Sequence, residues 1–125
     1  MATILIATED SLAYGVLSAE IEGEGFEVLW AQDGYEAIEL TRAQKPSAVF
    51  MESKLSIFNG FEVAETLRSD PDVPADLPIY LYEDDAVEPH RFEQAGFTAQ
   101  FLKKHAYQDI REILAPLVIL PAVDL

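Results

Sequence analysis

The chain has 125 residues, 50% of them apolar, and no cysteine, which suits one domain with a hydrophobic core and excludes disulfides and thiolate metal sites. Its 23 acidic and 8 basic residues give a net charge of −15, which repels nucleic acid and anionic membranes, so we expect neither as a partner. No apolar run is long enough to cross a membrane and the start lacks the features of a signal peptide, so we expect a cytoplasmic protein.

Apolar runs alternate with segments of helical spacing along the chain. Residues 3–7 form a short, continuous apolar run, which is typical of a strand covered on both faces. The next segment has helical spacing, with a cap at Asp10 or Ser11 and an end at Gly23. The same reasoning predicts, in chain order, a strand at 26–31, a helix at 35–42, a strand at 48–51, a helix at 60–68, a strand at 78–82, a helix at 86–94, a strand at 98–102 and a helix at 107–114.

This alternation of strands and helices predicts an α/β fold. Strand–helix–strand units call for right-handed crossovers, and these give a parallel sheet with helices on both faces. We find no internal repeat and no low-complexity tract. The sequence therefore predicts one domain over residues 1–115, followed by a short tail.

The tail, residues 116–125, is almost entirely apolar and contains two prolines, which prevent one long regular helix. Exposing it to water would be unfavourable, since each fully buried Leu, Val or Ile contributes roughly 1.5–3 kcal/mol. It could fold back over its own domain, or it could contact a second copy or another protein. We favour the intermolecular contact, because the core is complete at the last predicted helix.

Charged side chains follow the ends of four predicted strands. They are Glu9 and Asp10 after the first strand, Glu52 after the third, Glu83 after the fourth and Lys103 after the fifth. In a parallel sheet these strand ends share one edge, where open α/β sheets place their ligand chemistry. Each acid alone is explained as an ordinary solvated loop residue. As a set, however, they predict a functional site.

The chain resembles the receiver domains of bacterial two-component response regulators over nearly its whole length. The matching features are Ile4-Leu5-Ile6 followed by an acid pair, the stretch Ala31-Gln32-Asp33-Gly34-Tyr35-Glu36-Ala37, an acid eight residues before Gly60, Leu77-Pro78-Ile79, Ala95-Gly96 and Lys103. The resemblance implies a flavodoxin-like (βα)5 three-layer sandwich with a parallel sheet of order 2-1-3-4-5. It also implies a phosphorelay switch in which an aspartate accepts a phosphoryl group.

Part of the family's site is present in this sequence. Glu9 and Asp10 match the acid pair that holds Mg²⁺ in the family, and Lys103 matches its lysine. Together with Glu52, the pair would offer the hard oxygen ligands that Mg²⁺ or Ca²⁺ prefers. We therefore consider Mg²⁺ binding by Glu9, Asp10 and Glu52, although no cofactor is required by the pattern.

Three positions depart from the family's pattern. Glu52 stands at the phosphoacceptor aspartate, Glu83 at the switch Thr or Ser, and Gln100 at the aromatic switch residue. The extra methylene of Glu52 moves its carboxylate more than ~1 Å, and such a misplacement can cost on the order of 10²-fold in a positioned reaction. The Glu83 carboxylate would repel a phosphoryl group that a hydroxyl would bind. We therefore expect a degenerate receiver, or pseudo-receiver, that is not phosphorylated.

These features favour a stand-alone receiver that acts in signal transduction by protein–protein contact and is not an enzyme. In the family, such contacts use a face that corresponds here to 86–94, 98–102 and 107–114, around Phe92, Phe101 and Tyr107. That face, or the 116–125 tail, could also form a homodimer. Glu52 could reach Lys103 and imitate a phosphorylated aspartate, or the two could form a structural ion pair in a site that has lost its function.

Two other functions remain open from the sequence. One is a working phosphoreceiver that uses Glu52 with Mg²⁺. The other is a small metal-dependent hydrolase that uses the acid cluster, although the sequence contains no nucleophile–base pair and no nucleophile elbow. His90 is isolated and is expected to face solvent.

Overall fold

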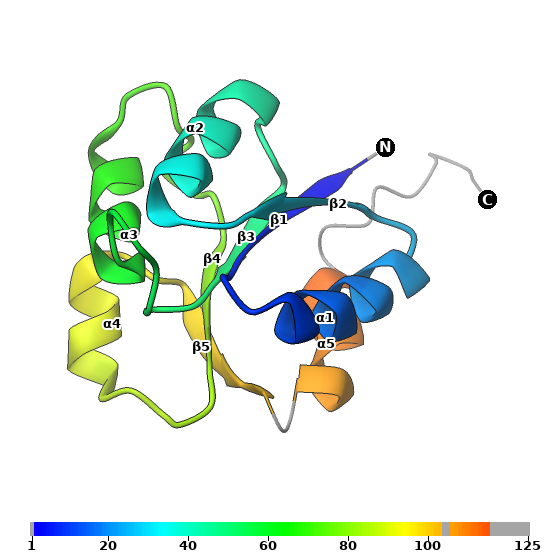
Figure 1. The fold of residues 1–125 in the computed structure, drawn as a ribbon. Helices are drawn as coiled ribbons and strands as arrows, with labels where there is room; N and C mark the ends of the chain where they lie inside the picture. The colour runs from blue at the N-terminus through cyan, green and yellow to red at the C-terminus, as the bar shows by residue number, and fades with distance from the viewer. Residues whose placement is uncertain (1, 104–105, 116–125) are drawn as a thin grey trace.

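The computed structural model of the chain describes residues 2–103 and 106–115, and the predicted tail, 116–125, lies outside the described residues. One parallel sheet has the order β2-β1-β3-β4-β5 (Figure 1). Its strands are β1 Thr3–Ala7, β2 Glu27–Ala31, β3 Ala48–Met51, β4 Ile79–Glu83 and β5 Ala99–Leu102. The helices are α1 Ser11–Gly23, α2 Gly34–Gln44, α3 Gly60–Ser69, α4 Pro89–Ala95 and α5 Ala106–Leu114. The predicted fold class and strand order are thus confirmed.

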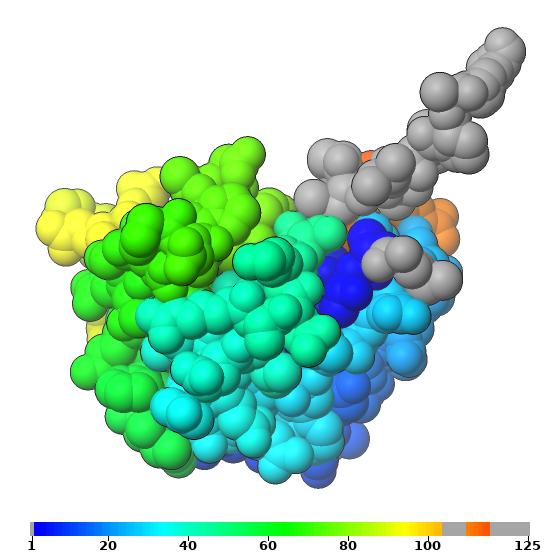
Figure 2. Space-filling model, turned by 90° about the horizontal axis from the view of Figure 1, so that it is seen from above, coloured from blue at the N-terminus to red at the C-terminus, as the bar shows by residue number. Residues whose placement is uncertain are grey.

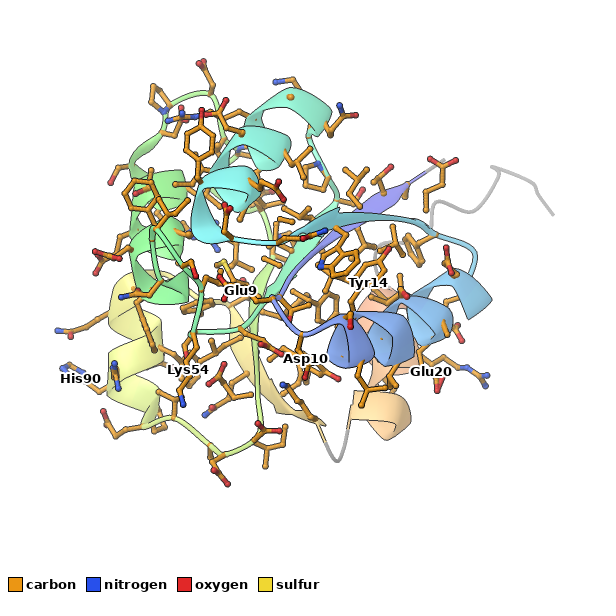
Figure 3. All side chains as sticks on the ribbon, viewed as in Figure 1. Glu9, Asp10, Tyr14, Glu20, Lys54 and His90 are labelled. Atoms are coloured by element: carbon orange, nitrogen blue, oxygen red, sulfur yellow. The ribbon has the colours of Figure 1, made fainter. Side chains whose placement is uncertain are left out.

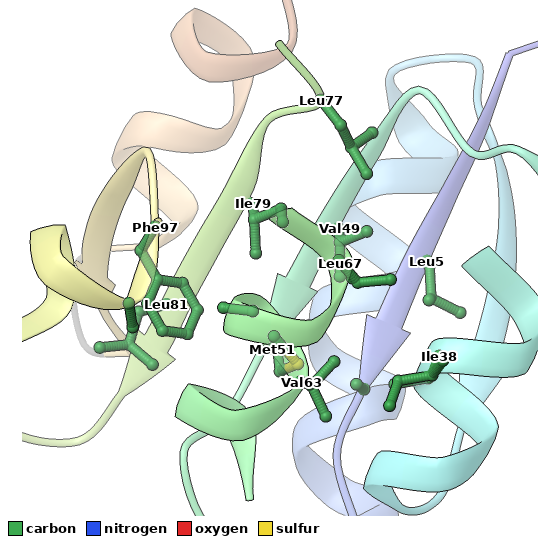
Figure 4. Packing of buried hydrophobic residues seen from close by; sticks show 14 of the residues in the cluster. Leu5, Ile38, Val49, Met51, Val63, Leu67, Leu77, Ile79, Leu81 and Phe97 are labelled. Carbon is green, nitrogen blue, oxygen red and sulfur yellow. The ribbon is translucent and has the colours of Figure 1, made fainter. Parts of the chain in front are cut away.

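The helices form one layer on each face of the sheet, because the strands alternate their side chains between the two faces. Leu5 of β1 packs towards α2, α3 and α4, whereas Ile4 and Ile6 pack towards α1 and α5. Figure 4 shows the first of these two clusters, and Figure 2 shows α2 directly beside α3 in the same layer. Both faces are therefore buried, which explains why β1 and β3 are continuous apolar runs.

Helix α4 begins later than the sequence predicted. It starts at Pro89, with Glu88 as its N-cap, so residues 86–88 belong to the β4–α4 loop. Proline is well suited to the first turn of a helix, because its ring would clash with a preceding turn and it has no N–H to donate. The loop between β4 and α4, residues 84–88, is consequently longer than expected, and several of its residues line the site described below.

The predicted contact face needs a correction at Phe92. This side chain is only 8% exposed and belongs to the core beneath α4, because Phe92 lies on the inward face of that helix, as Ala95 does. Phe101 is half-buried and its ring packs against those of Phe50 and Tyr80, with centroids 6.1 and 5.2 Å apart. The side chain of Tyr107 lies outside the described part of the chain.

Within the described residues, no helix combines the length and the apolar character that crossing a bilayer requires.

Candidate functional site

The charged side chains that follow the strands lie at one edge of the sheet, as the topology requires. Figure 3 shows Glu9 and Asp10 where β1 ends, with Lys54 nearby in the β3–α3 loop. Glu52 directly follows β3 and Lys103 directly follows β5. His90 lies apart from them on the exposed side of α4.

Glu52 and Lys103 form a close ion pair. Lys103 Nζ lies 2.6 Å from Glu52 Oε2, and the two side chains are 22% and 12% exposed. Apart from this ammonium contact, Oε2 has no hydrogen-bond partner among the described residues, although it is buried. Lys103 also lies 3.9 Å from the exposed Asp84 and 5.6 Å from the ring centroid of Tyr82. The structure thus brings together the two residues that the sequence placed at the ends of separate strands.

The surroundings of Lys103 keep its side chain charged. Burial lowers the pKa of an ammonium group, but here the hydrogen bond and the charge of Glu52 outweigh it, helped by the charges of Asp84 and Asp10. The net result is a pKa for Lys103 above its usual value. The Lys103 ammonium group therefore keeps its charge at neutral pH.

The close approach of α3 positions Glu52. Gly60 begins α3, and a Cβ on it would lie 2.4 Å from the backbone oxygen of Glu52, so only glycine allows this approach. Asn59 caps the helix in a reciprocal capping box with Glu62. The backbone N–H of Glu52 also donates to Ala7 O at 3.1 Å. Helix α3 and strand β1 together fix the backbone from which the Glu52 side chain projects.

The Glu83 carboxylate binds the β3–α3 loop. Its oxygens accept hydrogen bonds from Ser53 N at 2.7 Å and from Ser53 Oγ at 2.8 Å. Hydrogen bonds to a charged acceptor are among the stronger ones in proteins. Glu83 therefore joins the end of β4 to the residue that follows Glu52, a contact that the sequence analysis missed because no sequence pattern shows which donor a glutamate will choose.

The Gln100 amide holds the β4–α4 loop. Its Oε1 accepts from Val87 N at 2.8 Å and its Nε2 donates to Val87 O at 2.8 Å. The side-chain amide thus pairs with both the N–H and the C=O of one residue, as a neighbouring strand would. The sequence placed Gln100 at a switch position but contained no pattern that could reveal this pairing.

The side chains as placed do not form the Mg²⁺ site that the resemblance implies at Glu9, Asp10 and Glu52. Glu9 accepts a hydrogen bond from Ser56 N, and Asp10 caps α1 by accepting from Leu12 N and Ala13 N. Glu52 is paired with Lys103. Among the side chains that the structure describes, no three of the His, Cys, Asp or Glu type are grouped to hold a metal ion.

A pocket of about 550 Å³ opens beside the ion pair, within the size range of ligand-binding clefts. It is lined by Glu52 and Lys103, by the β3–α3 and β4–α4 loops, and by Phe61 and Arg91. The Arg91 guanidinium lies 4.4 Å from the ring centroid of Phe61. The sequence did not predict Phe61 or Arg91 as pocket residues. Both reach the pocket from helices, α3 and α4, whereas the sequence pattern pointed only to residues next to strand ends.

The strand order, the acids at the carboxyl edge and the lysine after β5 define a receiver-type signalling module. A family model described as response regulator receiver domain matches residues 4–115, so the chain belongs to the receiver domain family of two-component signalling.

Curated relatives agree with this assignment. The transcriptional regulatory protein PdtaR of Mycobacterium tuberculosis is 29% identical over 123 residues, which are 98% of this chain and 55% of PdtaR. Protein PilH of Pseudomonas aeruginosa is 32% identical over 81 residues, which are 65% of this chain and 66% of PilH. The chain thus spans little more than half the length of PdtaR.

Solved structures share the fold. The chemotaxis protein CheY4 of Vibrio cholerae has a TM-score of 0.83 at 18% identity and covers 94% of this chain and 99% of its own. The receiver domain of the sensor histidine kinase PA1611 of Pseudomonas aeruginosa, solved with magnesium in its active site cleft, has a TM-score of 0.82 at 21% identity. It covers 92% of this chain and 95% of its own. At these identities the likeness concerns the fold alone.

Proposed function

We propose that this receiver domain acts by protein–protein contact without being phosphorylated, and that it is not an enzyme. The observation that supports the proposal is the 2.6 Å ion pair between Glu52 and Lys103. The glutamate side chain spans the distance to the lysine by itself, so a carboxylate already occupies the position next to the ammonium group. A phosphoryl group arriving at Glu52 would have to break this pair first.

Glu83 provides a second obstacle to phosphorylation. It lines the pocket with a negative charge, and two unit charges at 4 Å interact by roughly 4 kcal/mol at an effective dielectric constant near 20. It also occupies the Ser53 N–H and hydroxyl, two donors that could otherwise bind an incoming anion. The proposal therefore rests on two glutamates that act independently.

The contact with a partner protein would use the α4–β5–α5 face. The Gln100–Val87 pairing supports this assignment, because it holds the loop that leads into α4 against β5. Glu88, His90 and Glu93 are exposed on or beside α4, whereas Phe92 is unavailable to a partner because it is buried. Stand-alone action and a homodimer through 116–125 or through this face remain predictions.

Phosphorylation can be tested directly by intact mass after incubation with Mg²⁺ and acetyl phosphate. We expect wild type to gain no phosphoryl group, because Glu52 is paired and Glu83 repels the donor. The double variant Glu52→Asp/Glu83→Thr, which restores the family's residue types, is the positive control and should gain one phosphoryl group. A gain by wild type that disappears in Glu52→Gln would contradict the proposal and favour a working phosphoreceiver.

The two interpretations of Glu52 make different predictions about binding to a signalling partner. If Glu52 imitates a phosphorylated aspartate, wild type should bind the partner more tightly than the unphosphorylated Glu52→Asp/Glu83→Thr variant. If the pair is only structural, both proteins should bind equally. Titration calorimetry with the same partner distinguishes the two results.

A further inference from the structure

The exposed large apolar side chains gather at the carboxyl edge of the sheet. In the described part of the chain they are Leu12, Tyr35, Ile57 and Phe58, with exposed fractions of 74%, 52%, 68% and 38%. Leu12 lies in the first turn of α1 and Tyr35 in the first turn of α2, while the other two lie in the β3–α3 loop. Tyr35, Ile57 and Phe58 therefore follow β2 or β3, away from the α4–β5–α5 face, whereas Leu12 lies on α1, which packs beside α5.

Tyr35, Ile57 and Phe58 belong to two segments in direct backbone contact, and we call these three residues the loop patch. Gly34 N, immediately before Tyr35, donates to Ser56 O at 3.0 Å, immediately before Ile57. A Cβ on Gly34 would lie 1.9 Å from the backbone oxygen of Phe58. The start of α2 and the β3–α3 loop thus form one continuous surface.

The loop is fixed although its apolar side chains are exposed. Leu55 anchors it in the core at 8% exposure, Ser56 N donates to Glu9, and Gly60 N donates to Ser53 O at 2.8 Å. Ile57 has a φ of 72°, a region that β-branched residues rarely adopt. A strained, well-anchored loop that presents Ile57 to solvent is already ordered for binding, which reduces the entropy lost on association.

Carboxylates surround the loop patch. Glu9 binds Ser56 N, Glu36 binds Gln32 N at 2.8 Å at the start of α2, and Glu62 binds Asn59 N at 2.9 Å. Lys54 is the single basic residue from 52 to 62, and the whole chain carries a net charge of −15. The loop patch is therefore an apolar surface with an acidic border.

We propose that the loop patch binds a basic amphipathic helix of a partner protein. Apolar side chains of the helix would cover Tyr35, Ile57 and Phe58, and its Lys and Arg side chains would face the surrounding carboxylates. A second copy of this chain does not fit, because the acidic borders of the two copies would repel each other. This surface is separate from the α4–β5–α5 face, so the inference goes beyond the proposed function and does not depend on it.

A synthetic amphipathic helix of leucine and lysine tests the proposal, with titration followed by amide chemical shifts of the ¹⁵N-labelled chain. We expect saturable binding, with shifts concentrated at the loop patch, and no binding of the same peptide with glutamate in place of lysine. Ile57→Asp should weaken binding about tenfold or more, because it removes an apolar contact that the bound helix would bury. If binding depended only on attraction between the negative chain and the positive peptide, this variant should bind more tightly, since it carries one more negative charge.

Ala43→Asp is the matched control, because it adds the same charge at an exposed position near the other end of α2. It should bind the peptide at least as tightly as wild type. Tyr35→Ser provides a second, uncharged test and should also weaken binding. Equal affinity of wild type and Ile57→Asp would overturn the proposal. A second result would also overturn it: the wild-type chain does not bind the peptide but self-associates, and Ile57→Asp abolishes the self-association. The loop patch would then bind a second copy of the chain.

Discussion

Single residues decide the chemistry of the site. Glu52 meets Lys103 across the edge of the sheet, and in the proposed function its side chain is one methylene longer than the aspartate that the family resemblance implies at this position. Glu83, which the family resemblance places at a hydroxyl position, accepts two hydrogen bonds from Ser53. Both carboxylates are thus bound by groups of the protein itself, Glu52 by an ammonium group and Glu83 by two hydrogen-bond donors. The groups that could bind an external anion are therefore already occupied by side-chain carboxylates.

The ion pair should make stability depend on alkaline pH. The folded pKa of Lys103 is raised, so the contribution of the pair is fully present below the unfolded pKa of roughly 10.4 and is lost as pH rises through the folded value. We therefore expect the free energies of unfolding of wild type and Glu52→Gln to converge as the pH rises above the folded pKa of Lys103. Urea unfolding at a series of pH values measures this. Glu65→Gln, an exposed change on α3, should show no such convergence, and a constant difference for Glu52→Gln would refute the linkage.

At the scale of elements, two helix starts shape the site. Helices α2 and α3 both begin with a glycine preceded by a capping side chain, Asp33 and Asn59 respectively. Gly34 lies against the backbone of the β3–α3 loop and Gly60 against the backbone of Glu52. The loop is therefore enclosed between two helix ends, which explains how it can be ordered while its tip is exposed.

Replacing Gly34 should be much more harmful than replacing a glycine at a helix end that faces open space. Gly34→Ala would place a Cβ 1.9 Å from Phe58 O, and we expect a loss of about 1–3 kcal/mol or more in the free energy of unfolding. Gly23→Ala is the control, since no atom lies within 4 Å of its Cβ position and alanine favours the helix. Chemical denaturation of both variants checks this. Equal stability would mean that the loop moves aside freely.

Over the whole molecule, repulsion between the many carboxylates outweighs the attraction within the few ion pairs. The net charge is −15, and the described residues contain five ion pairs, of which the Glu52–Lys103 pair is the one with both side chains largely buried. Such a charge favours solubility but opposes the compact state. It also makes acidic surfaces a poor match for another copy of the same chain.

Salt should therefore stabilise the protein. Raising NaCl from about 0.01 to about 0.5 M shortens the screening length several-fold and weakens the repulsion, so we expect the thermal midpoint at neutral pH to rise by several degrees. Scanning calorimetry at matched pH measures the change. A midpoint that falls with salt would show that ion pairs contribute more than the repulsion removes.

Hydrophobic periodicity predicted the fold, and the positions of charged residues next to strand ends predicted which residues lie together at the site. The apolar runs located all five strands, and the resemblance implied their order. The start of α4 was predicted too early, because the pattern gave little weight to Pro89, and Phe92 was expected at the surface although it faces the core. The convergence of Glu52, Glu83 and Lys103 followed from topology alone.

The sequence by itself determined which elements form and which charged residues share an edge, because hydrophobic periodicity and strand alternation are local properties of the chain. Only the tertiary structure decided the partner of each side chain: Lys103 for Glu52, Ser53 for Glu83 and Val87 for Gln100. These choices depend on ångström-scale distances between segments that are far apart in sequence. A carboxylate beside several donors binds the one that the packed backbone brings within reach.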